Sequence, residues 1–99
     1  MKYLWTYEFD QENAEEISGR NRELDRAIKK YPDRYPKLHT AYMTGLCSGF
    51  RIVEAENEEQ LTQLVMFFYP LERWDIKPLF EGKSVSQVWR KKLVSRVDY

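Results

Sequence analysis

The chain has little cysteine, no net charge and no long apolar run. Its one cysteine, Cys47, excludes an internal disulfide and a cluster of cysteine ligands around a metal ion. Sixteen basic and sixteen acidic residues balance to a formal charge of zero, so long-range attraction to nucleic acid phosphates is not expected. No apolar stretch approaches about 18 residues and no signal peptide is visible, so we expect a soluble, cytoplasmic protein without a membrane partner.

Repeats, low-complexity segments and internal linkers are also missing, so residues 1–99 are expected to form a single domain. Aromatic residues, by contrast, are abundant. The chain has three tryptophans, seven tyrosines and five phenylalanines, and they fall mainly in segments where apolar residues alternate with polar ones.

Two periodicities follow one another along the chain and predict its elements. Alternation typical of strands occurs near residues 2–9, 37–44, 49–55 and 73–80. Helical spacing occurs at about residues 11–31, 57–69 and 84–94. The resulting order, βαββαβ with an extra C-terminal helix, is typical of a two-layer α+β domain of the ferredoxin-like type with a four-stranded antiparallel sheet.

Two local signals refine this prediction. Asn57 and Gln60 have the spacing of a capping box, in which the two side chains satisfy free backbone amides at the start of a helix. Pro78 cannot donate a hydrogen bond to a neighbouring strand, so the last strand is expected at an edge of the sheet.

The sheet has a second face that the chain must cover. Two helices cover one face of a four-stranded sheet, yet neither face of the first strand has the uniformly polar side chains of a solvent face. The two sets are Tyr3, Trp5, Tyr7 and Phe9 on one face and Leu4, Thr6 and Glu8 on the other. We therefore expect a homodimer that packs sheet against sheet, with a small pocket in each subunit between the sheet and its helices.

Four segments resemble a known family. They are Met1–Phe9, the Leu38-His39 pair, Gly49–Ala55 and Trp74–Pro78. Together they resemble the small DUF3303-type proteins, within the wider set of dimeric α/β-barrel (ferredoxin-like) domains. The resemblance implies a dimeric barrel but no settled activity, because the DUF3303-type group is itself functionally undefined. Relatives in the wider set include cofactor-free monooxygenases, muconolactone-isomerase-like enzymes and stress-responsive barrel proteins. The chain departs from the pattern in a longer 31–36 connection and an extended basic last helix.

Two residues are candidates for catalysis. His39 is the only histidine and could act as a general base toward an acidic carbon or a phenol, although a hydrogen-bonded structural histidine is the simpler interpretation. Arg51 interrupts an apolar strand and could anchor a carboxylate or an enolate. The alternative is that Arg51 pairs with a nearby carboxylate, for which Glu54 and Glu8 are the candidates.

Four aromatic residues are candidates for ligand binding. Trp5, Tyr7, Tyr42 and Trp74 could stack on a planar ligand and donate hydrogen bonds through their polar atoms. They could equally belong to the core or to a dimer interface. The sequence contains no spacing typical of a metal site, a phosphate-binding loop, a nucleophile elbow or a dinucleotide fingerprint, so no metal and no cofactor is expected.

RNA binding has to be considered because RNA-recognition domains share the βαββαβ order. Residues 48–55 partly match the aromatic signature of their third strand, but only Phe50 supplies a ring, and Ile52 and Ala55 stand where rings are needed. We therefore expect no nucleic acid partner. The remaining hypotheses are a homodimer that binds a small aromatic or apolar ligand, and a cofactor-independent monooxygenase or isomerase that uses His39 as its base.

Overall fold

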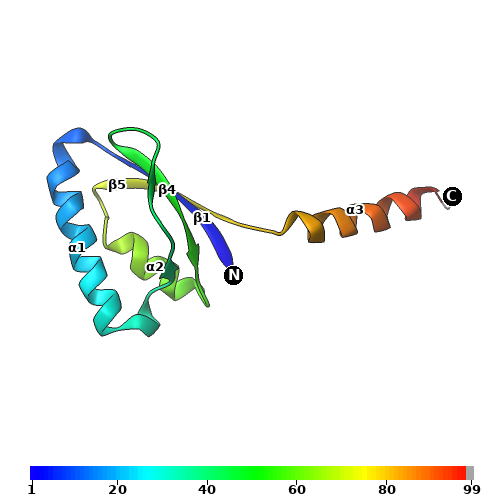
Figure 1. The fold of residues 1–99 in the computed structure, drawn as a ribbon, viewed down its shortest axis with the longest axis horizontal. Coiled ribbons are helices and arrows are strands. Elements are labelled where there is room, and N and C mark those ends of the chain that lie inside the picture. The colour runs from blue at the N-terminus through cyan, green and yellow to red at the C-terminus, as the bar shows by residue number, and fades with distance from the viewer. Residues whose placement is uncertain (98–99) are drawn as a thin grey trace.

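The computed structural model describes residues 1–97 and has a mixed α+β fold with an antiparallel sheet, as predicted (Figure 1). Its strands are β1 (Lys2–Phe9), β2 (Lys37–Leu38), β3 (Tyr42–Met43), β4 (Ser48–Glu54) and β5 (Glu72–Pro78). Its helices are α1 (Ala14–Lys30), α2 (Glu58–Met66) and α3 (Gly82–Val97), with short 3-10 turns η1 (Gln11–Asn13) and η2 (Pro32–Arg34).

The sheet has the order β2-β4-β1-β5, and β3 also pairs with β4. Every pair of neighbouring strands is antiparallel. The longest strand, β1, lies at the centre and pairs with β4 on one side and β5 on the other. Pro78 lies at the end of the edge strand β5, where its missing N–H costs no ladder hydrogen bond, so this expectation is confirmed.

The predicted strand at 37–44 is interrupted, so the sheet has five strands rather than four. Strand β2 ends at Leu38 opposite Val53, and β3 begins at Tyr42 opposite Phe50. Four steps along the edge (38 to 42) therefore oppose three steps along β4 (53 to 50). One residue is extra, which is the definition of a β-bulge, and it bends the edge segment away from a regular ladder.

Helices α1 and α2 lie on the same side of the sheet (Figure 1). The side chains of Trp5 and Phe9 on β1 are buried on that side. The core that fills the space between the layers consists of Trp5, Phe9, Ile17, Leu24, Val53, Leu64 and Phe68. The helix-facing side of β1 is thus the face that carries Tyr3, Trp5, Tyr7 and Phe9.

Helix α2 begins at the predicted capping residues. The Asn57 side-chain oxygen accepts a hydrogen bond from the Gln60 amide at 2.9 Å. The Gln60 side chain accepts a hydrogen bond from the backbone N–H of Glu56 at 2.8 Å and donates one to the Asp33 carbonyl at 3.0 Å. In a capping box the Gln60 side chain would accept from the amide of the N-cap residue Asn57, and here it accepts from the amide one residue earlier. Its bond to Asp33 also links α2 to the η2 turn.

The opposite face of the sheet carries several apolar side chains. In the register of β1, β4 and β3 this open face includes Leu4 opposite Ile52, Thr6 opposite Phe50, and Tyr42 opposite Phe50. The Tyr42 and Phe50 rings stack with centroids 5.4 Å apart. We refer to Leu4, Tyr42, Phe50 and Ile52 as the open-face patch.

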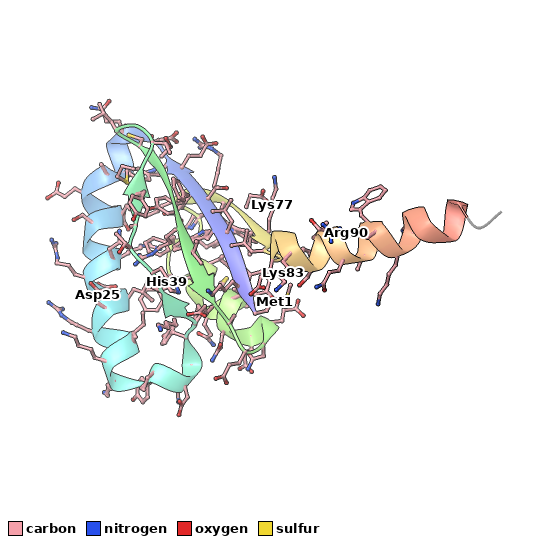
Figure 2. The ribbon with its side chains drawn as sticks, turned by 45° about the vertical axis from the view of Figure 1, so that its right-hand side comes forward. Met1, Asp25, His39, Lys77, Lys83 and Arg90 are labelled. Carbon is pink, nitrogen blue, oxygen red and sulfur yellow. The ribbon has the colours of Figure 1, made fainter. Side chains whose placement is uncertain are left out.

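Helix α3 extends away from the two-layer body (Figure 1). In Figure 2 the labelled residues Lys83 and Arg90 lie on this helix, whereas the labelled residues Asp25 and His39 lie in the two-layer body. The longest dimension of the described chain is 60 Å, against 30 and 21 Å for the other two, and the projecting helix accounts for this elongation. The side chains of Val85, Val88 and Trp89 on α3 are exposed.

Replacement of Gly49 tests the close approach of β3 to β4. A Cβ at this position would meet the Tyr42 carbonyl oxygen and would lie 3.0 Å from the Tyr7 ring. We expect Gly49→Ala to lower the free energy of unfolding by about 1–3 kcal/mol, because the β3 edge must move to relieve the contact. Urea titration measures this change. Gly82→Ala is the control, since a Cβ there meets nothing within 4 Å, and equal stability of the two variants would contradict the packing described.

Candidate functional site

A cavity of about 220 Å³ lies between α1 and the sheet. Its inner wall is made of buried apolar side chains, including Trp5, Phe9 and Phe68. Its rim is made of exposed residues from two segments, Ser18 and Asn21 on α1 and Ala41 and Met43 on the bulged edge. The cavity is therefore closed toward the core and opens to solvent between α1 and the 41–43 segment.

The sequence of α1 explains why space remains there. Ala14, Ile17, Ser18 and Asn21 have the spacing i, i+3, i+4 and i+7, which places them on one face of the helix. Ile17 reaches the core, but Ala14 and Ser18 are too small to fill the gap beneath them. A large apolar residue at position 14 or 18 would close it.

Glu72 is the unusual residue of this cavity. It is the first residue of β5, faces the same side as Phe9 opposite to it, and is only 8% exposed. Its Oε1 atom is buried without a hydrogen-bond partner. Burial raises the pKa of this carboxyl to about 8, so most molecules carry a proton on Glu72 at neutral pH.

Besides Ser18 and Asn21 at the rim, three further polar groups share the cavity with Glu72. The Trp5 indole Nε1 is buried and has no hydrogen-bond partner. Burial raises the pKa of the Tyr7 hydroxyl; the charge of Arg51 opposes this shift and the charge of Glu72 adds to it. Burial also lowers the pKa of the Arg51 guanidinium, which Tyr7 and Asp25 partly offset. The Tyr7 hydroxyl therefore interacts electrostatically with both Arg51 and Glu72.

Arg51 is held in the cavity wall by the bulge. Its Nε donates a hydrogen bond of 2.9 Å to the His39 carbonyl oxygen, at the point where the edge segment leaves the ladder. This bond fixes the base of the guanidinium and leaves its two terminal nitrogens for other partners. Neither carboxylate considered for Arg51 pairs with it among the described contacts, because Glu8 pairs with Arg73 and Glu54 pairs with His39 and Lys37.

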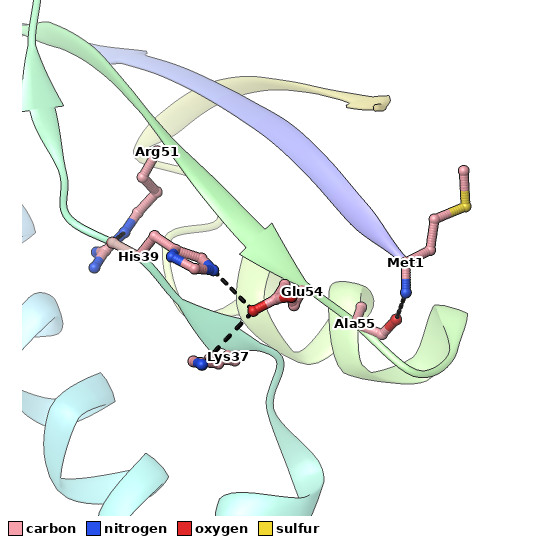
Figure 3. A network of polar contacts seen from close by, with 6 residues as sticks. All are labelled: Met1, Lys37, His39, Arg51, Glu54 and Ala55. Carbon is pink, nitrogen blue, oxygen red and sulfur yellow. Dashed lines mark hydrogen bonds and ion pairs between the residues drawn. The ribbon is translucent and has the colours of Figure 1, made fainter. Parts of the chain in front are cut away.

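The candidate base His39 lies outside this cavity. Its Nε2 is 2.8 Å from Glu54 Oε2, and Lys37 approaches the same oxygen at 3.8 Å (Figure 3). The hydrogen bond from His39 lowers the pKa of the Glu54 carboxyl. In Figure 3 the Arg51 side chain runs toward the His39 backbone, whereas the His39 ring points the other way, toward Glu54, so the two candidate catalytic side chains do not converge. Catalysis by His39 stays a prediction.

The four aromatic candidates separate into two groups. Trp5 and Tyr7 line the cavity together, with ring centroids 5.0 Å apart. Tyr42 belongs to the open-face patch, and Trp74 lies on the edge strand β5 with about half of its surface exposed. Of the six residues singled out in the sequence, the structure brings together Trp5, Tyr7 and Arg51.

Glu72 escaped the sequence reasoning because a charged residue before a strand is usually solvated. A signal was present, however. The strand was expected to begin at residue 73, and an earlier start would have placed Glu72 in phase with Trp74 and Ile76. Ser18 and Asn21 were missed in the same way, as polar residues within the inward face of a helix.

The polar groups of the cavity suit an organic ligand better than a metal ion. Glu72 is the one carboxylate among its lining residues. Within residues 1–97, no group of three or more His, Cys, Asp or Glu side chains is arranged to hold a metal ion. Over the same residues, no helix combines the length and the apolar character that crossing a membrane requires.

The pH dependence of stability tests the environment of Glu72. The folded carboxyl keeps its proton up to about pH 8, whereas the unfolded one loses it near 4.5, so folding becomes less favourable as pH rises through this window. At about 1.4 kcal/mol per pH unit, the proton that Glu72 retains lowers the free energy of unfolding at neutral pH by roughly 3 kcal/mol relative to acidic pH. We expect Glu72→Gln to flatten the profile and to exceed the parent protein in stability above neutrality.

Urea titrations at a series of pH values between about 5 and 9 measure this effect. Glu81→Gln is the control, because Glu81 is exposed and its replacement should leave the slope of the profile unchanged. Parallel profiles for the parent protein and Glu72→Gln would show that Glu72 ionises as freely in the native state as in the unfolded chain.

Comparison with known proteins supports the resemblance seen in the sequence. The sequence profile described as "Domain of unknown function (DUF3303)" matches residues 1–93 of the 99 residues. No curated protein matches the chain. Because the profile spans the sheet, the helices that pack on it and most of α3, the chain belongs to the DUF3303 family.

Proposed function

We propose that this protein is a homodimer that binds a small aromatic or apolar ligand in the cavity between α1 and the sheet. The observation that carries the proposal is the pair of buried atoms without partners, Trp5 Nε1 and Glu72 Oε1, at one cavity. A buried polar atom without a hydrogen bond costs roughly 1–3 kcal/mol. A bound ligand with matching polar atoms would recover part of this cost.

The size and walls of the cavity favour a single aromatic ring. An apolar cavity of about 150 Å³ is large enough to bind benzene. The present cavity of about 220 Å³ leaves room for a ring with a polar substituent. Trp5, Tyr7 and Phe68 provide aromatic surface, and aromatic pairs gain about 0.5–1.5 kcal/mol beyond the burial of area.

Ligand-dependent stabilisation tests the binding proposal. Phenol and indole are suitable probes because each combines a ring with one polar group. At ten times the dissociation constant we expect stabilisation by about 1.4 kcal/mol, which raises the melting temperature by several degrees. Ser18→Leu should abolish the shift by filling the cavity, whereas Arg22→Leu, an exposed position on α1 that does not line it, should preserve it. Equal shifts in the two variants, or none in the parent protein, would contradict the proposal.

The homodimer is supported by the open-face patch. The strand order β2-β4-β1-β5 with α1 and α2 on one side is compatible with a ferredoxin-like subunit, and it leaves Leu4, Phe50 and Ile52 on the opposite side. Burial of such a patch against an identical one removes both from water and follows a two-fold axis in most homodimers.

The charges that flank this patch do not oppose association with an identical copy. Glu8 pairs with Arg73 at 2.9 Å, and Asp75 pairs with Lys77 at 3.5 Å, all four residues coming from β1 and β5. Arg73 also pairs with Asp10 at 3.4 Å, so each flanking charge lies beside an opposite one within the subunit and two open faces can approach without strong repulsion.

Sedimentation velocity on an Ile52 variant tests the dimer. Ile52 is 36% exposed in the single chain and lies beside Leu4 near the middle of the patch. We expect Ile52→Glu to produce monomers, because a carboxylate would have to be buried in the interface. Leu46→Glu is the control, since Leu46 is 90% exposed in the loop before β4. A parent protein that sediments as a monomer would overturn this part of the proposal.

A further inference from the structure

Away from the rim, where Ser18 and Asn21 can both donate and accept, the polar groups of the cavity are mainly hydrogen-bond donors. The indole N–H of Trp5 and the guanidinium of Arg51 can only donate, and the Tyr7 hydroxyl can donate as well as accept. Trp5 Nε1 is buried with no acceptor. The cavity is therefore better matched to a ligand that supplies acceptor oxygens than to one that supplies N–H or O–H groups.

The charge of the cavity points the same way. Arg51 remains a cation, whereas the buried Glu72 keeps its proton at neutral pH because its pKa is about 8. The other titratable or charged residues that line the cavity are Tyr7 from β1 and Arg51 from β4, and the side chains that α1 and the 41–43 segment contribute are uncharged. Asp25 on α1, whose charge raises the pKa of Arg51, is itself exposed to solvent. The lining residues thus carry one net positive charge at neutral pH.

We infer that the cavity selects a single-ring aromatic carboxylate, held as its monoanion by Arg51, Trp5 and Tyr7. This inference rests on the proposed function, since it assumes that the same cavity is the ligand site. A carboxylate offers two acceptor oxygens, which suit the planar guanidinium and one or two further donors. The protonated carboxyl of Glu72 supplies another donor, so the anion meets no negative charge in the cavity.

Placement of the ring follows from the arrangement of the walls. The side chains of Phe9, Phe68 and Trp5 line the inner part and offer it apolar contact. Arg51 is half-buried and tied to the His39 carbonyl at the bulge, so its charge is held in the wall before any ligand arrives. A preformed donor of this kind loses little side-chain entropy on binding.

Calorimetric titration with two matched compounds tests the inference. Benzoate and benzamide have the same ring and similar size, but only benzoate is an anion. At about pH 6 we expect benzoate to bind at least roughly tenfold more tightly, because charge-assisted hydrogen bonds are about twice as strong as neutral ones. Equal binding of the two compounds would overturn the inference while supporting the proposed function. Binding of neither compound would count against both.

The dependence on pH identifies the role of Glu72. At about pH 9.5 Glu72 is ionised while Tyr7, whose pKa is raised by burial, keeps its proton, so benzoate affinity should fall by roughly tenfold or more. Glu72→Gln should keep its benzoate affinity at both pH values, because the amide stays neutral and can still donate. An equal fall in both proteins would show that Glu72 does not face the anion.

Two substitutions distinguish recognition of the ligand's charge from recognition of its shape. Arg51→Gln should remove the preference for benzoate over benzamide, with Arg22→Gln, outside the cavity on α1, as the matched control. If Arg51→Gln fails to fold, Tyr7→Phe provides a milder test, because it removes one hydroxyl and keeps the ring that packs on Trp5. We expect Tyr7→Phe to weaken benzoate severalfold and benzamide less, and an equal effect on both compounds would contradict the assignment of Tyr7 to the anion.

Discussion

The burial of one face of β1 against α1 and α2 is the constraint on which the rest of the structure depends. Strand β1 is central, so its helix-facing side chains hold β4 and β5 in a single layer beneath the helices. Trp5, only 2% exposed, contacts the Phe68 ring after α2 with centroids 5.8 Å apart. The cavity exists because small residues of α1 leave the neighbouring space unfilled, and its polar groups are brought there by the same strand register.

Stability and ligand binding oppose one another at this cavity. A buried carboxyl that must keep its proton weakens the native state as pH rises, and a buried indole N–H without an acceptor adds a further cost. Packing alone would favour apolar residues at both positions. Polar groups with perturbed pKa values that gather in a cavity are typical of functional sites, which is why Glu72 and Trp5 carry the proposed function.

The bulge between β2 and β3 decides which polar residues act together. It places the His39 carbonyl where Arg51 can bond to it, and so holds the guanidinium toward α1. The His39 ring instead meets Glu54, and that pair also engages Lys37. His39 and Arg51, the two candidate catalytic residues, are thus connected through the His39 backbone. Their side chains lie apart, because the guanidinium lines the cavity and the imidazole pairs with Glu54.

Local patterns in the chain were sufficient for the mixed α+β class, for the faces of β1 and for the start of α2. Each depends on residues close in sequence, through the two-residue period of a strand or the spacing of a cap. Long-range pairing decided the rest. The extra residue between Leu38 and Tyr42 appears only against β4, and the burial of Glu72 requires β5 to begin two residues before Trp74 and beneath α1. Strand register and helix placement depend on segments far apart in the chain, so no local pattern could specify them.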